Sequence, residues 1–329
     1  MSEIVLKVDA LETTFAPRSS LGRSKGAPVR AVDGVSLTLA RGEMLALVGE
    51  SGCGKTTTAQ TILRMVAATG GSVELAGHDI THASHKQMQP LRRNIQIVYQ
   101  DPYEALDPRF RVRQAVEEPL LIHERLSKAE RLARVTTALE TVGLTPPESF
   151  LDRFPHELSG GQRQRVAIAA ALVLDPDVLV ADEPVSMLDV SVRAGILDLL
   201  ATLRRERGMA VLMITHDLST AARFADRIAV MYLGRIVEEG PARTVVDDPQ
   251  HPYTRALLSV VPERDPLLRV VPVLLTGEPP NAANIPPGCR FHPRCPVAIA
   301  QCREVDPVLT DLADGEGHRA ACVRLPWLT

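Results

Sequence analysis

The stretch GESGCGKT, residues 49–56, constrains the fold of this 329-residue chain more than any other feature. It follows the apolar run Met44–Val48, which predicts a short buried strand, and leads into a helical pattern over residues 55–66. In the pattern G-x-x-x-x-G-K-S/T, glycines let backbone N–H groups wrap a phosphate. Lys55 reaches the β- and γ-phosphates, Thr56 offers its hydroxyl to Mg²⁺, and Cys53 is interpreted as a small filler. The alternative is a glycine-rich turn without a ligand.

The stretch VLVADEP, residues 178–184, supplies two acids at the end of a second buried strand, predicted over Val178–Asp182. Two carboxylates at such a position are costly unless they meet a cation. Asp182 is expected to hold Mg²⁺, directly or through water, and Glu183 to act as general base on the attacking water. Alone, this pair often marks a surface turn, but beside GESGCGKT it indicates a site for hydrolysis.

The remaining pattern predicts a layered α/β protein. A helix over residues 191–207 and a strand over Ala210–Ile214 follow the acidic strand, and such alternation favours a parallel sheet covered on both faces. Residues 112–143 are expected to be helical, with a capping box formed by Ser127 and Glu130. Because 13 of the 25 prolines and four of the five cysteines follow residue 246, we expect a separate extension over 246–329.

Composition excludes several classes of protein. The net charge of −3 argues against a nucleic-acid partner, which a clear basic excess usually accompanies. No stretch resembles a signal peptide or is apolar enough to span a membrane, so any membrane role is expected to be peripheral. The few cysteines favour a reduced, cytoplasmic setting over a disulfide scaffold.

The stretch LSGGQRQR, residues 158–165, predicts a second place for a phosphate. Two glycines precede an apolar helical run, and a helix N-terminus offers unpaired N–H groups and the positive end of its dipole. With LSGGQ between GESGCGKT and VLVADEP, the chain resembles the ATP-binding cassette (ABC) family over roughly residues 1–245. The resemblance implies a P-loop NTPase (RecA-like) core with an antiparallel β subdomain and a helical subdomain over about 101–165.

The resemblance also implies roles for individual residues. Gln100 matches the glutamine that senses Mg²⁺ and water, Asp189 ends the D-loop SMLD, and His216 matches the histidine that contacts the γ-phosphate. Phe15 falls where the family stacks an aromatic ring on adenine. From the residues alone, a lone His216 is more typical of a hydrogen-bonded polar group at a strand end, and a core residue is the alternative for Phe15. Together the implied ATP and Mg²⁺ contacts are Phe15, Gly49, Glu50, Ser51, Gly52, Cys53, Gly54, Lys55, Thr56, Thr57, Gln100 and Asp182.

In this family two cassettes pack head to tail, and each ATP lies between them. The resemblance therefore implies that Ser159, Gly160, Gly161 and Gln162 face a nucleotide held by a partner chain. This helix end contributes only while ATP bridges the two cassettes. ATP binding therefore closes the pair of cassettes, and ATP hydrolysis releases it.

Three further stretches resemble the ATPase subunits of oligopeptide and dipeptide importers: QDPYEALDPR (100–109), HPYTRALLSVVP (251–262) and PPGCRFHPRCPVAIAQC (286–302). The resemblance implies a peripheral subunit on the cytoplasmic side of the cell membrane. It would work with a second, different cassette, two permease subunits and an external substrate-binding protein. Alternatives are another cargo (an oligosaccharide, glutathione or a nickel chelate), a soluble ATPase acting on DNA or ribosomes, and a redox sensor.

Four cysteines of the extension, Cys289, Cys295, Cys302 and Cys322, are candidate metal ligands. Their irregular spacing matches structural zinc poorly, since zinc favours ligand pairs two to four residues apart. Four thiolates can hold a [4Fe–4S] cluster, and chains that resemble this one carry such a cluster there. Zinc and free cysteines remain alternatives.

Overall fold

The computed structural model describes residues 3–16, 19–20, 23–24, 27–260, 273, 275, 277, 280–312 and 317–325. The last two residues of HPYTRALLSVVP therefore lie outside the described part. The chain divides into two compact units, each assembled from separate segments. Unit 1 contains Met1–Leu6, Leu39–Met44 and Ala83–Ile214, and unit 2 contains Lys7–Thr38, Leu45–His82 and Thr215–Thr329.

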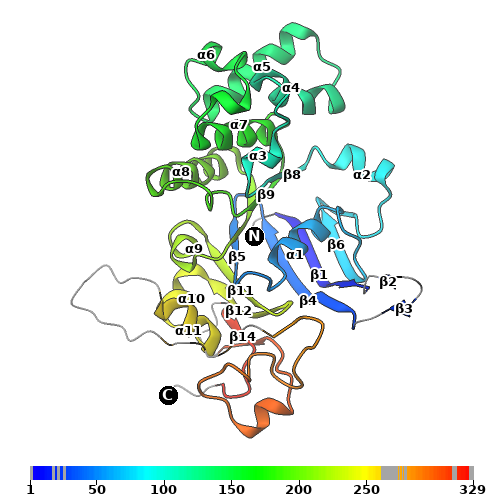
Figure 1. The fold of residues 1–329 in the computed structure, drawn as a ribbon, viewed down its shortest axis with the longest axis vertical. Coiled ribbons are helices and arrows are strands. Elements are labelled where there is room, and N and C mark those ends of the chain that lie inside the picture. Colours follow the sequence, from blue (N-terminus) through cyan, green and yellow to red (C-terminus); the bar gives the residue numbers. More distant parts are fainter. Residues whose placement is uncertain are drawn as a thin grey trace, which may run out of the picture. The chain divides into compact units, whose positions relative to one another are not determined.

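Unit 2 carries a four-stranded sheet built mainly from long alternating strands. Buried and exposed side chains alternate along much of its strand β1, as expected when one face covers a core. The strand order is β4-β1-β6-β7, and β6 and β7 are antiparallel. Figure 1 labels β4, β1 and β6 of this sheet. The strands are β1 (Ile4–Phe15), β4 (Val29–Ala40), β6 (Gly70–Leu75) and β7 (His78–Asp79), beside the small pair β2 (Ser19–Ser20) and β3 (Arg23–Ser24).

A second set of strands in unit 2 carries the glycine-rich loop. Strand β5 (Met44–Val48), fully buried as its apolar run predicts, pairs in parallel with β11 (Arg227–Tyr232). Strand β12 (Arg235–Pro241) returns antiparallel to β11, and its outer edge pairs with the short strand β14 (Arg319–Ala320), which in turn pairs with β13 (Thr310–Asp311). The helices of this unit are α1 (Lys55–Ile62), α9 (Leu218–Phe224), α10 (Ala242–Asp247), α11 (Pro252–Ser259) and the 3₁₀ turn η2 (Ala300–Arg303).

The C-terminal region is tied to β12 through a buried carboxylate. Glu238 is fully buried and accepts hydrogen bonds from the backbone N–H groups of Gln250 (2.6 Å) and His251 (2.9 Å). His318, 80 residues further along, places Nε2 2.8 Å from the same carboxylate. A buried acid is tolerated only when its oxygens are hydrogen-bonded, so these three partners fix the extension to the sheet edge.

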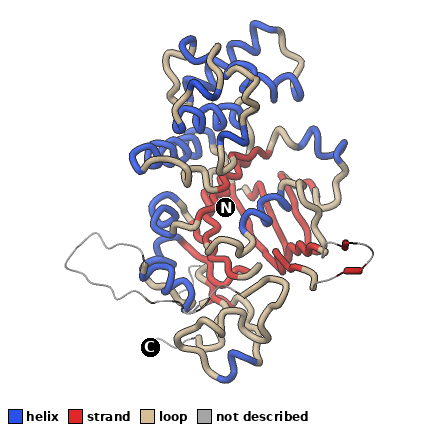
Figure 2. Tube along the Cα trace, in the orientation of Figure 1, coloured by secondary structure: helices blue, strands red, loops and turns tan. Residues whose placement is uncertain are grey.

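Unit 1 combines three parallel strands with a helical region. The strands lie in the order β10-β9-β8, and both pairs are parallel, as the alternating pattern predicted. Figure 2 shows that helices dominate the chain between β8 and β9. The strands are β8 (Ile95–Val98), β9 (Val178–Asp182) and β10 (Ala210–Thr215); the helices are α2 (His85–Leu91), α3 (Pro102–Ala105), α4 (Val112–His123), α5 (Lys128–Thr141), α6 (Glu148–Leu151), η1 (Pro155–Glu157), α7 (Gly160–Leu172) and α8 (Val190–Arg207).

Two helical predictions need correction. The expected helix over 55–66 ends at Ile62, because Arg64 adopts a positive φ of 55° and the N–H groups of Met65 and Val66 both turn back to Gln60. The expected helical stretch 112–143 is two helices, and the second begins at the predicted capping box of Ser127 and Glu130. Among the helices that the structure describes, none is long and apolar enough to cross a membrane.

Candidate active site

The loop between β5 and α1 has a backbone that requires its glycines. Gly54 has φ of +111°, and a Cβ there would lie 2.2 Å from the carbonyl oxygen of Ala31. A Cβ on Gly49 would lie equally close to the carbonyl oxygen of Met231. Gly52 also has a positive φ, of +79°. Side chains are therefore excluded from both ends of the loop, and the backbone can approach a phosphate closely.

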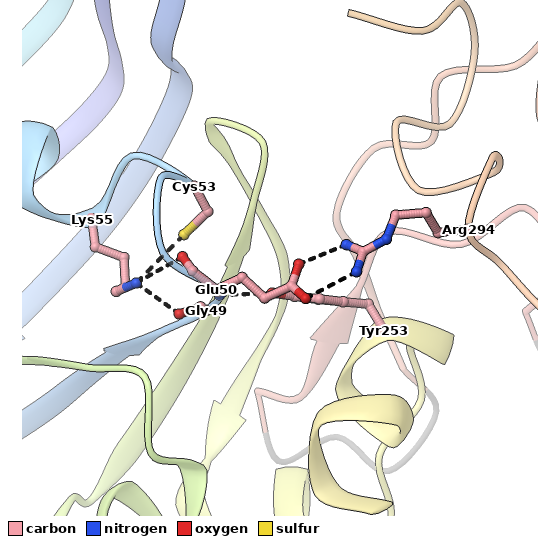
Figure 3. Close-up of polar contacts among 6 residues, drawn as sticks. All are labelled: Gly49, Glu50, Cys53, Lys55, Tyr253 and Arg294. Carbon is pink, nitrogen blue, oxygen red and sulfur yellow. Dashed lines mark hydrogen bonds and ion pairs between the residues drawn. The ribbon is translucent and has the colours of Figure 1, made fainter. Parts of the chain in front are cut away.

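Lys55 opens α1 and folds back across the loop (Figure 3). Its Nζ donates to the carbonyl oxygens of Gly49 at 2.7 Å and Glu50 at 2.9 Å, and the residue is only 5% exposed. The Sγ of Cys53 lies 3.9 Å from the same nitrogen. Burial raises the pKa of the Cys53 thiol, which fits an unreactive filler. The ammonium group is thus held inside the loop, where the sequence places the β- and γ-phosphates.

The remaining predicted contacts in unit 2 differ in exposure. Ser51, Thr56 and His216 are exposed, and Thr57 is half-buried. Phe15, at the end of β1, is 42% exposed, so it is not a core residue. The alternative interpretation of Phe15, a ring packed in the core, is therefore wrong. Stacking of the ring on adenine stays a prediction.

Unit 1 holds the acids at the end of β9. Asp182 is 7% exposed. Glu183 follows with φ of +45°, a costly backbone conformation for a residue with a side chain, and its N–H donates to the carbonyl oxygen of Ile214 at 3.0 Å. The amide Nε2 of Gln100, just after β8, lies 3.3 Å from Glu183 Oε2. The structure therefore brings together Gln100 and Glu183, two residues 83 positions apart in sequence.

The LSGGQ stretch begins helix α7, as predicted. Ser159 is the N-cap: its hydroxyl accepts from the N–H of Gln162 at 3.3 Å, and the Gln162 side chain accepts from the N–H of Ser159 at 3.0 Å. A Cβ on Gly161 would lie 2.6 Å from Cγ1 of Val192, so this glycine allows α7 to pack against α8. Gly160 has more room, its Cβ position lying 3.5 Å from the Leu188 side chain. Capping and packing thus account for the serine and one glycine.

The D-loop leads into helix α8. Asp189 is the N-cap residue of this helix and is exposed, without a side-chain capping hydrogen bond. Met187, in the same loop, is 64% exposed, so its side chain does not enter the core.

The four cysteines of the extension surround one small cavity in unit 2. Cys289, Cys295, Cys302 and Cys322 all line it, together with His251 and Phe291 among others. All four are free thiols, and burial raises the pKa of Cys289 to about 11. Within the described ranges, no group of three or more His, Cys, Asp or Glu side chains is arranged to hold a metal ion. His292, which also lines the cavity, places Nδ1 2.9 Å from the carbonyl oxygen of Cys289, and His318 contacts Glu238.

Sequence reasoning missed two residues that touch the phosphate loop. Arg294 makes a two-pronged ion pair with Glu50, and the Tyr253 hydroxyl accepts from the Glu50 N–H (Figure 3). Both lie in stretches that were singled out for resemblance alone, HPYTR and HPRC. In the sequence, neither Tyr253 nor Arg294 belongs to a pattern that indicates a contact with a residue more than 200 positions away.

Comparison with known proteins places these observations in a family. The family model described as ABC transporter matches residues 32–186, and the one described as oligopeptide/dipeptide transporter, C-terminal region, matches residues 237–302. The chain is 48% identical to the dipeptide transport ATP-binding protein DppF of Haemophilus influenzae, over 89% of each chain. It is 43% identical to the oligopeptide transport ATP-binding protein AppF of Bacillus subtilis, over 97% of each.

Solved structures support the same fold. The dimeric ATP-binding cassette MJ0796, in a post-hydrolysis state bound to ADP and phosphate, is similar with a TM-score of 0.64 and 31% identity, covering 72% of this chain and 99% of that one. Protein cbiO1 of Clostridium perfringens, part of an ABC transporter complex, gives the same TM-score and identity over 75% and 92%. With its phosphate loop, acid-ended strand and signature helix, the chain belongs to the ABC transporter ATPases, in the oligopeptide and dipeptide import family.

Proposed function

We propose that this chain hydrolyses ATP to power the uptake of dipeptides or oligopeptides across the cell membrane. The observation that carries the hydrolytic role is the hydrogen bond between Gln100 and Glu183 beside the buried Asp182, at the ends of parallel strands. Peptide cargo is supported by the C-terminal region and by the names of the relatives.

We assign the residue roles as follows. Lys55 binds the β- and γ-phosphates with the loop N–H groups, and Phe15 stacks on adenine. Thr56, Gln100 and Asp182 would hold Mg²⁺, which when bound would neutralise charge on the phosphates. Glu183 orients and deprotonates the attacking water, and His216 contacts the γ-phosphate. The strained backbone at Glu183 fits such a role, since strain of this kind concentrates at functional sites.

Transport in a reconstituted system tests the cargo. The chain, its partner cassette and the two permease subunits would be placed in proteoliposomes with the cassettes on the outer side, and the binding protein would be enclosed in the lumen, on the opposite face. ATP-dependent movement of a labelled dipeptide or oligopeptide is expected. Movement of an oligosaccharide, glutathione or a nickel chelate instead would change the assigned cargo and leave the role as the ATPase of an importer unchanged. ATPase activity stimulated by nucleic acid or ribosomes, without the membrane subunits, would overturn the proposal.

Each cassette is expected to complete the ATP site of the other through the helix that begins at LSGGQ, which is α7 in this chain. The relative MJ0796 is described as dimeric, which supports pairing of cassettes here. We assign Ser159, Gly160, Gly161 and Gln162 to the nucleotide bound by the partner, with Asp189 at the same interface. The partner is expected to be a different chain, so the active complex is a heterodimer of cassettes below the permease.

Changing Ser159 to arginine tests this split site. We expect ATP binding to the isolated chain to be nearly unchanged, because the substitution lies outside the phosphate loop, whereas ATP-dependent pairing with the partner and hydrolysis should be lost. Ser127→Arg is the matched control, since Ser127 caps α5 with the same box and its loss costs about 1 kcal/mol of helix stability. Sedimentation with ATP measures pairing; equal pairing in both variants contradicts the split site.

We also propose that the four-cysteine cavity holds a [4Fe–4S] cluster. The four thiols line a common cavity, yet no set of them within the described residues suits a single ion, which would sit about 2.3 Å from each sulfur. A [4Fe–4S] core is held by four thiolates, and the four cysteines at this cavity supply that number. Bound there, it would hold the short turns of the extension in one shape, a structural role.

Iron content tests this assignment. Protein purified without oxygen should be brown and contain about four iron and four sulfide per chain. Cys295→Ser should lose most of the iron, while ATP binding is weakened at most, because Lys55 and its loop lie outside the cavity. Cys53→Ser is the control and should keep its iron. Colourless anaerobic protein, with one zinc or no metal, would rule out the cluster.

A further inference from the structure

Glu50, the second residue of the phosphate loop, has every polar group engaged (Figure 3). Its carboxylate accepts from Nη1 and Nη2 of Arg294 at 2.6 and 3.0 Å. Its N–H donates to the hydroxyl of Tyr253 at 2.9 Å, and its carbonyl oxygen accepts from Nζ of Lys55. The N–H of residue 50 therefore points toward the C-terminal extension and is not available to a phosphate.

Arg294 is held in place for this contact. Its side chain is 6% exposed, and the hydrogen bonds to Glu50 raise the pKa of its guanidinium. Arg294 lies in two consecutive turns. Its N–H donates to the carbonyl oxygen of Phe291, and the N–H of Cys295 donates to the carbonyl oxygen of His292. A fork-to-fork arginine–carboxylate pair fixes direction as well as distance. A lysine at this position would keep the charge and lose that direction.

Tyr253 is fixed by aromatic packing. It is fully buried, and its ring lies 4.7 Å from that of Tyr232 and 5.4 Å from that of Phe291, measured between centroids. Its hydroxyl is the hydrogen-bond acceptor for the loop N–H. Both contacts to Glu50 thus come from structured parts of the extension. Arg294 reaches Glu50 from the consecutive turns around Cys295, and Tyr253 reaches it from α11.

A glycine-rich loop has a conformational cost that such contacts remove. Gly49, Gly52 and Gly54 give the loop many backbone states when nothing restrains it, and binding a nucleotide must then select one of them. Restraints that hold the binding conformation in advance raise affinity by removing this cost. They leave the chemical step largely unchanged, because they do not touch the reacting atoms.

We propose that Arg294 and Tyr253 are positioning residues for the phosphate loop, so that the extension is part of the ATP-binding machinery. The extension sets nucleotide affinity by holding Glu50. This inference rests on the proposed function, in which the loop around Lys55 binds the phosphates.

Nucleotide binding to the full-length chain tests the inference. With fluorescent mant-ATP and Mg²⁺, Arg294→Ala should raise Kd about tenfold, as loss of a charge-assisted hydrogen bond predicts. Arg294→Lys and Tyr253→Phe should each raise it severalfold. In the assembled complex, KM for ATP should rise in parallel while kcat at saturating ATP changes less than twofold. Arg319→Ala is the matched control, because Arg319 pairs with Glu239 in the same unit, away from the loop.

Two further measurements separate positioning from general damage. Thermal melting curves identify any variant that has unfolded. If Arg294→Ala has unfolded, the Kd values of Arg294→Lys and Tyr253→Phe decide whether the inference holds. In a double-mutant cycle, adding Glu50→Gln to Arg294→Ala should weaken binding little beyond Arg294→Ala alone, whereas additive losses would overturn the coupling.

The failure of this inference differs from the failure of the proposed site. If folded Arg294 and Tyr253 variants bind mant-ATP like the unmodified chain while Lys55→Ala does not, the positioning role is wrong and the site stands. If Lys55→Ala also binds normally, the loop is not the ATP site, and both proposals fall.

Discussion

Replacing Glu183 with glutamine should lower ATP hydrolysis by the assembled transporter on the order of a hundredfold or more, while ATP still binds. Glutamine keeps the size of the side chain and an oxygen that can accept from Gln100, so the geometry at the end of β9 should persist. The amide cannot take a proton from water, and the transition state loses its base. Phosphate release by the assembled complex, alongside mant-ATP binding, measures the two effects separately.

A trapped closed state should accompany the loss. Because ATP is bound and not consumed, the Glu183→Gln chain and its partner should stay paired in sedimentation with ATP and separate with ADP. Glu140→Gln, an exposed substitution on α5, is the control and should hydrolyse ATP normally. Hydrolysis near the unmodified rate in the Glu183 variant would mean that another residue is the base or that the partner's site does the work.

Replacing Lys55 with alanine should weaken ATP binding itself by about one to two orders of magnitude, the range expected for a lost charged hydrogen-bond donor. The structure adds a second reason, since the same Nζ holds the carbonyl oxygens of Gly49 and Glu50. Without it, the loop loses an internal restraint as well as its charge for the phosphates. Titration of the full-length chain with mant-ATP gives the affinity directly.

The comparison with Lys128→Ala excludes a general charge effect. Lys128 is an exposed lysine at the start of α5, and its loss should leave Kd within about twofold of the unmodified value, as for most surface substitutions. If Lys55→Ala kept full affinity, the GESGCGKT loop would not be the phosphate site, whatever its backbone geometry.

Local chemistry made much of this fold predictable. The buried strand before the phosphate loop, the strand that ends at Asp182 and the capping box at Ser127 all depend on residues close in sequence. Gly143 adopts φ of +75° just after α5, a conformation that glycine commonly supplies at the end of a helix. In each case the pattern and the structure express the same short-range preference.

Contacts between distant residues could not be read in this way. Arg294 and Glu50 are 244 positions apart, and neither residue carries a pattern that names the other. The hydrogen bond from Gln100 to Glu183 was not foreseen either, although both residues were singled out, because motifs assign roles without assigning neighbours. The early end of α1 is similar: Arg64 takes a left-handed conformation that its side chain does not favour, so no residue type announced it.

The link between Glu238 and His318 has a consequence for the newly made chain. Glu238 leaves the ribosome 80 residues before His318, and in the described part of the chain the outer edge of β12 pairs with β14, at Arg319 and Ala320. Until that late strand emerges, β12 is an open edge with an acid that the finished sheet buries, and open edges attract other chains. A stop codon shortly before codon 318 would remove no predicted ATP contact. Its expected result is a chain that aggregates during production.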